Sequence, residues 1–337
     1  GGAAGRGRDE HRARPLPREG RVELSLAEVE PDTWNEVLEE LGFVDVYLTR
    51  EYLEASTLLE SGRPLFLRAE QAVFAAILRE GPVDVITPYG YGGPVGARFW
   101  DPYRHWCRDN GVVTTFVRFH PLYANQREAG PDVHVQPLAG TVAWRLDEEG
   151  DLFERMHRHH RRVVRKALSA GVEATAQFAP ESLAGFVALY EPTMERQEAD
   201  DFYYFPAEYW RALETSLRDH VVLFEAGDDA KLLCLHAPPW LHYHLGASSD
   251  AGRKLGAGTL LFLEAARWAQ ELGYTRFHLG GGVGGARDSL YEFKLRFDPG
   301  GEVEAAIGKA IHDREAYRRL AGPEAGLDGF FPAYRRA

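Results

Sequence analysis

Apolar and polar residues follow two kinds of spacing along this chain, and each spacing predicts a different element. Short runs in which apolar side chains alternate or continue predict strands, whereas apolar side chains three and four residues apart predict helices. The expected strands are residues 22–26, 64–69, 72–79, 83–88, 112–119, 172–178, 221–226, 231–237, 240–246 and 275–280. The expected helices are residues 32–41, 100–110, 152–169, 181–198, 206–219, 260–272 and 313–320. Because strands and helices are interleaved, the pattern predicts a layered α/β fold.

The pattern restarts near residues 138–150, where an acidic turn follows an apolar stretch. A length of 337 residues fits two domains of roughly 100–200 residues each. We therefore expect a first domain at 21–145, joined by the C-terminal segment 311–337, and a second domain at 146–310. Residues 1–20 are rich in Gly, Pro and Arg and almost lack apolar side chains, which predicts a disordered tail.

Composition narrows the class of protein. A hydrophobic content of 45% with 27% charged residues is typical of a soluble globular protein. No apolar run approaches the ~20 residues that a membrane span needs, and no secretory signal is seen, so we expect a cytoplasmic protein. The net charge of −12 argues against DNA as a partner but leaves room for a local basic patch. Cys107 and Cys234 lie in apolar segments and read as buried thiols.

A glycine-rich turn precedes the helix expected at 260–272. It contains Arg253, Gly256 and Gly258 in the order Arg-x-x-Gly-x-Gly. Free N–H groups and the positive end of a helix dipole favour an anion at such a place. The alternative is a capped turn before a packed helix.

Arginines recur on the helix expected at 152–169. Arg155, Arg158, Arg162 and Arg165 are three and four residues apart, which places them on one helical face. Because charges of one sign repel each other, this face favours a phosphate partner such as the backbone of tRNA. The alternative is a solvated surface with scattered counter-charges.

Aromatic and cationic residues indicate a small-molecule site. Lys294 stands between Phe293 and Phe297, so its charge can be held in a cleft; the alternative is a surface cation. Tyr89 and Tyr91 lie in a glycine-rich loop that would let a polar ligand approach the backbone; the alternative is a rigid turn.

Three histidines are candidates for a catalytic base. His120 follows an expected strand, and His242 and His244 share one face of the strand at 240–246. We take His120 and His244 as the weak catalytic candidates; the alternative is that they are satisfied buried groups. The histidines at 157, 159 and 160 lack a carboxylate or cysteine at metal spacing, so no metal site is expected.

The order of these segments resembles that of a known superfamily over roughly residues 45–310. The loop of Arg253, Gly256 and Gly258 resembles the pyrophosphate loop of the GCN5-related N-acyltransferases (GNAT). The helix that follows, the glycines at 280–285 and the Phe-Lys-x-x-Phe segment at 293–297 resemble the Fem-type peptidyltransferases (FemABX) and the BioF2-like acyltransferases. The resemblance implies two tandem GNAT-like domains with a cleft between them. It gives Lys294 the position of a phosphate-binding lysine and places the loop at 88–94 on the substrate wall.

The same resemblance implies an acyltransferase that forms amide bonds. Its acceptor would be the amine of a small molecule or cell-envelope precursor. A Fem-type enzyme takes aminoacyl-tRNA as donor, with Arg158, Arg162 and Arg165 as its contacts, whereas the intact loop at Arg253 favours acyl-CoA and N-acetyl transfer to an amino sugar or other small amine. We expect no tightly bound cofactor. A third alternative is a non-catalytic binder of phosphorylated metabolites.

Overall fold

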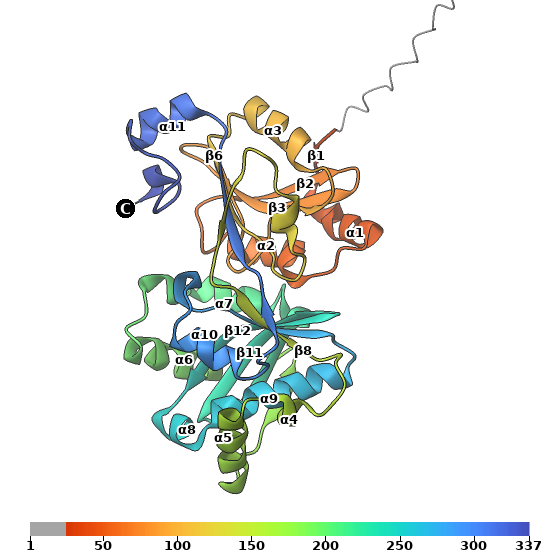
Figure 1. Cartoon of the computed structure of the whole chain (residues 1–337), viewed down its shortest axis with the longest axis vertical. Coiled ribbons are helices and arrows are strands. Elements are labelled where there is room, and N and C mark those ends of the chain that lie inside the picture. Colours follow the sequence, from red (N-terminus) through yellow and green to blue (C-terminus); the bar gives the residue numbers. More distant parts are fainter. Residues whose placement is uncertain (1–24, 337) are drawn as a thin grey trace, which may run out of the picture.

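The computed structural model describes residues 25–336 and shows two α/β domains, each built on one mixed sheet (Figure 1). The predicted α/β fold with two domains is therefore confirmed. The tail expected at 1–20 and most of the strand expected at 22–26 lie outside the described residues.

The first sheet carries helices on both faces. On one face, α1 (Pro31–Leu41) and α2 (Arg50–Ser56) bury Trp34 and Leu53 against the sheet. On the other, α3 (Trp100–Asp109) buries Tyr103. Its strands, in spatial order, are β1 (Ala27–Glu28), β2 (Arg63–Ala69), β3 (Ala72–Arg79), β4 (Asp84–Ile86), β6 (Thr114–Arg118), β15 (Ala306–Ile311) and β7 (His134–Pro137), and β5 (Val95–Gly96) pairs with β3.

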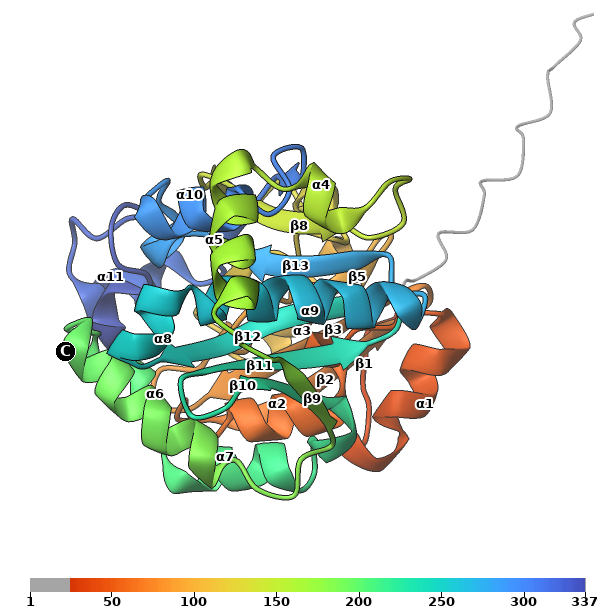
Figure 2. The ribbon, with the colours of Figure 1, turned by 90° about the horizontal axis from the view of Figure 1, so that it is seen from below.

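The second sheet is also covered on both faces (Figure 2). One face packs on α9 (Ala257–Glu271), which α5 (Arg158–Ser169) contacts in turn. The other face packs on α6 (Ala184–Arg196), α7 (Ala207–Glu214) and, from the first domain, Tyr47 and Tyr52. Its strands, in spatial order, are β14 (Glu302–Val303), β8 (Thr141–Arg145), β13 (Arg276–Gly280), β12 (Trp240–Ser248), β11 (Ala230–Ala237), β10 (Val221–Ala226) and β9 (Thr175–Phe178).

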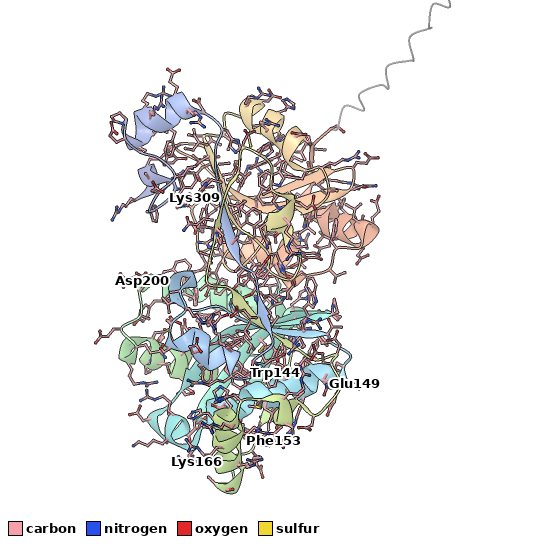
Figure 3. All side chains as sticks on the ribbon, viewed as in Figure 1. Trp144, Glu149, Phe153, Lys166, Asp200 and Lys309 are labelled. Atoms are coloured by element: carbon pink, nitrogen blue, oxygen red, sulfur yellow. The ribbon has the colours of Figure 1, made fainter. Side chains whose placement is uncertain are left out.

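The chain changes sheet twice, and not where the sequence places the boundaries. β8, expected in the first domain, pairs with β13 of the second sheet. The chain returns to the first sheet at β15, which pairs with β6 and begins before residue 311, where the sequence places the return. Lys309 of β15 is buried in the upper domain of Figure 3 and donates hydrogen bonds to the carbonyl oxygens of Leu327 and Gly329. This bond pair attaches the segment that contains α11 (Arg314–Ala321) to the first domain.

The basic helix expected at 152–169 is two helices. α4 (Leu152–Arg155) ends at Met156, and extended backbone at Met156 and His157 precedes α5. Arg155 consequently leaves the arginine face and contacts the carboxylate of Asp298 and the carbonyl of Arg145. The prediction that four arginines share one face is therefore wrong for Arg155.

The described residues contain no helix that is both long and apolar enough to cross a membrane.

Candidate active site

A gap opens between two parallel strands near the middle of the second sheet. β12 and β13 pair only from Trp240 to His242, opposite Arg276 to His278. Beyond that point β12 continues to Ser248 without a parallel partner and contains a bulge, because the pairing with β11 skips His244. A bulge leaves a backbone group unpaired and bends its strand. Strand divergence and bulge together create a polar site inside an otherwise paired sheet.

Lys294 fills this gap. Lys294 lies on helix α10 (Ser289–Leu295), whose N-terminus is capped by the side chain of Asp288. Its ammonium group donates to the carbonyl oxygen of Gly281 at 2.6 Å. The ammonium nitrogen is 5.3 Å from the ring centroid of Tyr243 on β12. Only 6% of Lys294 is exposed, and burial lowers its pKa to about 8, against a smaller opposite effect of Asp288. The alternative of a surface cation is wrong.

Tyr91 of the first domain reaches the same place. A side chain on Gly280, whose φ is +76°, would meet both the Lys294 ammonium at 3.4 Å and the Tyr91 hydroxyl at 3.5 Å. Burial raises the pKa of Tyr91 to about 12, against smaller opposite effects of its hydrogen bond with the Gly281 backbone and of Arg118. Glycine at 280 therefore keeps the space between a cation and a phenol open.

Tyr89 lies to one side of this centre. Its ring packs on Phe202, Phe205 and His244, with centroid distances of 5.3, 5.8 and 5.8 Å. The intervening Gly90 has a φ of +92°, and a Cβ there would lie 2.7 Å from the Tyr47 ring. Close packing against Tyr47 therefore requires glycine at position 90. This agrees with the alternative that the loop is a rigid structural turn.

A buried carboxylate and three imidazoles meet beside the gap. The Oδ2 atom of Asp45 is 2.7 Å from Nε2 of His242 and 3.4 Å from Nε2 of His120. His242 in turn contacts His278, with 3.4 Å between the Nδ1 atoms, and Nε2 of His278 is 2.9 Å from the Thr141 hydroxyl. Burial opposes ionisation of Asp45, but the two neighbouring histidines outweigh it and lower its pKa.

His244 lies apart from this cluster. It shares a strand face with His242, as predicted, since both contact first-domain tyrosines. Its Nε2 is 2.9 Å from the Tyr209 hydroxyl, and burial lowers its pKa to about 3. Of the two weak candidates, only His120 joins Asp45. Asp45 and His278 are missed by the sequence analysis; Asp45 lies in no recognisable motif, and its partners are far along the chain.

A basic hollow of about 470 Å³ lies at the start of α5. No ion pair involves Arg158, Arg162 or Arg296 among residues 25–336. Arg165 is separate from the hollow, stacked 5.0 Å over Phe153. The hollow is lined by His157, Arg158, His159, Arg162 and Arg296.

Helix α10 connects the hollow to Lys294. The backbone N–H of His157 donates to the carbonyl oxygen of Arg296 at 2.9 Å, and Nε2 of His160 is 2.9 Å from the carbonyl oxygen of Phe293. Arg296 and Lys294 are two residues apart at the end of this short helix. α10 and its C-terminal cap therefore contribute both the buried ammonium and one of the cations that line the hollow, while α5 contributes the others.

The glycine turn is packed against α5. A short helix, α8 (Asp250–Leu255), precedes it and contains Arg253, whose guanidinium pairs with Asp250 at 2.7 Å. Gly256 has a φ of +82°, and a Cβ there would lie 2.3 Å from Cγ1 of Val163. A Cβ on Gly258 would lie 3.3 Å from the Ser248 hydroxyl. The capped-turn alternative thus explains Gly256 without a ligand.

Lys166 fixes the same contact. The ammonium group of Lys166, which is labelled in Figure 3, donates to the carbonyl oxygen of Lys254 at 2.5 Å. α5 therefore lies directly against the turn between α8 and α9.

Comparison with known proteins agrees with this fold. Residues 154–295 match the family model of the acetyltransferase (GNAT) domain. The structure of FemX superposes with a TM-score of 0.66 at 14% identity, over 88% of this chain and 100% of FemX. L-PGS from Bacillus licheniformis gives 0.55 at 16% identity, over 85% of this chain and 93% of L-PGS. The structure of a protein of unknown function from Bacteroides thetaiotaomicron has a TM-score of 0.59 at 10% identity, over 85% of this chain and 99% of that protein. No curated protein sequence matches the chain.

The matched segment runs from α4 through β12, α9 and β13 to α10, so it contains the gap, Lys294 and the glycine turn. The FemX likeness extends the shared fold to both domains. This chain therefore carries a GNAT acyltransferase domain in residues 154–295, within a two-domain fold that it shares with FemX.

Proposed function

We propose that this protein transfers an aminoacyl group from aminoacyl-tRNA to the amine of a small molecule or cell-envelope precursor. The observation that supports this donor is the arginine hollow, which one helix connects to Lys294. A protein with a net charge of −12 retains here three arginines without carboxylate partners among the described residues. Such a surface suits a polyphosphate backbone.

The reacting carbonyl would lie in the gap between β12 and β13. The acceptor nitrogen attacks the carbonyl carbon of the aminoacyl ester, a C–N bond forms, and the bond to the ribose oxygen of tRNA breaks. The Lys294 ammonium, in a site with little water, stabilises the negative charge that develops on the carbonyl oxygen. The proton that the amine loses goes to the departing ribose oxygen. The chain's main contribution is thus alignment and charge stabilisation.

Acyl-CoA is the second candidate donor. The observation that favours it is the N-terminus of the 15-residue helix α9, which follows Arg253 and Gly256 and offers backbone N–H groups. Against it, Val163 of α5 occupies the space beside Gly256, and Arg253 is paired with Asp250. We therefore place tRNA first.

Two labelled donors separate the alternatives. The purified protein is incubated with an extract of small metabolites and envelope precursors, and with either labelled acetyl-CoA or tRNA charged with labelled amino acids. The proposal expects labelled amide product from charged tRNA, and none when the donor is treated with RNase beforehand. Product from acetyl-CoA alone would establish the second candidate. Binding of phosphorylated metabolites without transfer from either donor would favour a non-catalytic binder.

The arginine hollow can be tested by the salt dependence of tRNA binding. Each phosphate neutralised contributes about 0.7–0.9 to the slope of log affinity against log salt. Replacing Arg158 and Arg162 with Gln should therefore flatten the slope by about one to two units. Arg211→Gln is the matched control, because this exposed arginine of α7 makes no ion pair within the described part of the chain. A double variant with the wild-type slope would remove the hollow from the donor site.

A further inference from the structure

One carboxylate of the first domain lies between two imidazoles, one from each domain. Asp45 and His120 belong to the first domain, and His242 belongs to β12 of the second. We propose that Asp45, His120 and His242 bind one divalent transition-metal ion of the zinc class, which joins the two domains. This inference is independent of the donor and acceptor proposed above.

The donor set and its dimensions suit such an ion. Two imidazole nitrogens and one carboxylate oxygen are common zinc ligands, at ~2.0–2.2 Å from the metal. A tetrahedral centre with these bonds separates its ligand atoms by about 3.3 Å. The distance from Asp45 Oδ2 to His120 Nε2 is 3.4 Å, and all three ligand atoms lie within 4.8 Å of one another. The distance from Asp45 Oδ2 to His242 Nε2, 2.7 Å, would lengthen by about 0.6 Å.

The surrounding hydrogen bonds orient the ligands. The second oxygen of Asp45, Oδ1, accepts the backbone N–H of Tyr47 at 2.8 Å, which fixes the carboxylate plane. Nδ1 of His242 faces Nδ1 of His278, whose Nε2 contacts Thr141. Metal-bound histidines usually donate their second N–H to a hydrogen-bond acceptor, and the unprotonated Nδ1 of His278 would be that acceptor here. His242 can therefore direct a bare Nε2 towards the ion.

His120 supplies the second, independent observation. Its side chain is fully buried, and its Nε2 has no hydrogen-bond partner although it faces Asp45. A buried polar atom without a partner destabilises the folded state, and a metal bond would remove that cost. Binding requires two proton changes. Nε2 of His242 would give up the proton that it now donates to Asp45, and His120 would carry its proton on Nδ1, which would then lose the long hydrogen bond that it accepts from the backbone N–H of Tyr123 at 3.4 Å.

Aromatic rings shield the cluster from water. The Tyr47 ring lies 4.7 Å from His242, and the Trp240 ring stacks on His120 at 5.6 Å.

Three protein ligands leave one coordination position of a tetrahedral ion for a water molecule or a substrate atom. Because the ligands come from residues 45, 120 and 242, the ion would link segments that are far apart along the chain.

Metal content and metal-dependent stability test the proposal on the whole chain. The wild-type protein, purified without metal-affinity resin, is analysed by mass spectrometry for metals. After removal of metal by a chelator, Zn²⁺ or Co²⁺ is added. We expect one ion per chain, the visible absorption of tetrahedral Co²⁺, and a melting temperature about 5 °C higher at a thousandfold excess over Kd.

Variants locate the ion. His120→Gln and His242→Gln should each abolish the Co²⁺ absorption and the thermal shift. His236→Gln is the control, because His236 is another buried histidine with a partnerless ring nitrogen but lies outside the cluster. Wild-type protein without stoichiometric metal, Co²⁺ absorption or thermal shift would overturn the proposal. Binding that survives in both ligand variants would overturn it as well.

Discussion

Replacing Lys294 with Met should lower activity without a loss of stability. Lys294 has an ordinary pKa of 10.5 and a folded-state pKa of about 8. The folded protein therefore disfavours the charged ammonium relative to the neutral amine by roughly 3 kcal/mol. Methionine has similar length and no charge, but it loses the bond to Gly281, worth ~1.5–3 kcal/mol. We expect the free energy of unfolding at pH 7 to stay equal or to rise by up to about 1.5 kcal/mol, the difference between these two effects.

The pH dependence gives a sharper test of the same change. Between pH 8 and 10.5 the unfolded chain still binds the Lys294 proton while the folded protein has released it. Stability of the wild type therefore rises with pH over this window through Lys294, and the unfavourable contribution is full below pH 8. Lys294→Met lacks this dependence. The difference between wild type and variant should shift in favour of wild type by roughly 3 kcal/mol from pH 7.5 to 10.5.

Urea denaturation at several pH values and steady-state kinetics supply the two readouts. Loss of one charge-assisted interaction with the reacting group should lower kcat/KM by about 10- to 150-fold. Lys309→Met is the matched control: this lysine is also buried and bonded to carbonyl oxygens, but in the first sheet far from Gly280. We expect it to lose stability and to keep its kinetic constants.

Two outcomes would refute the reasoning about Lys294. One is a variant that unfolds more easily at pH 7 by more than about 1 kcal/mol with no difference in pH dependence, which would make the lysine a structural bond donor. The other is a folded variant with unchanged kcat/KM, which would remove Lys294 from the reaction.

Two further changes test the packing around the site. Gly256→Ala should lower the free energy of unfolding by about 1–3 kcal/mol, because of its positive φ and the Val163 contact, and Val163→Ala in the same chain should restore part of it in urea titrations. A neutral Gly256→Ala effect would contradict this explanation. Asp298→Asn should cost about 1.5–3 kcal/mol at pH 7, the contribution of hydrogen bonds to a charged group. Burial opposes ionisation of Asp298, but Arg145 and Arg155 outweigh this effect and lower its pKa. The stability difference between wild type and variant should therefore vanish as the pH falls through the folded-state pKa of Asp298. A stability difference that stays constant down to pH 2 would contradict this ion-pair explanation.

Local patterns were enough to predict most elements of the second sheet. Residues 221–226 form β10 as predicted, and the strand and helix expected at 275–280 and 260–272 are β13 and most of α9. Such elements are set by short-range periodicity and by glycines that end helices, both visible in a window of a few residues. The break between α4 and α5 was not predicted, because the extended backbone at Met156 and His157 leaves no mark in the helical spacing, and the partner of Arg155, Asp298, is far along the chain.

The candidate site divides in the same way. The sequence by itself determined the acyltransferase resemblance and selected Lys294 and Tyr91, which occur in recognisable glycine and aromatic segments. Only the tertiary structure decided that they meet at Gly280 and that Asp45 contacts His242, 197 positions away. It also placed β8 in the second sheet and β15 in the first, each opposite to the domain expected from the sequence. Periodicity records that a face is buried, but the same apolar or polar pattern is compatible with many partners. The partner is therefore selected by packing of the whole chain.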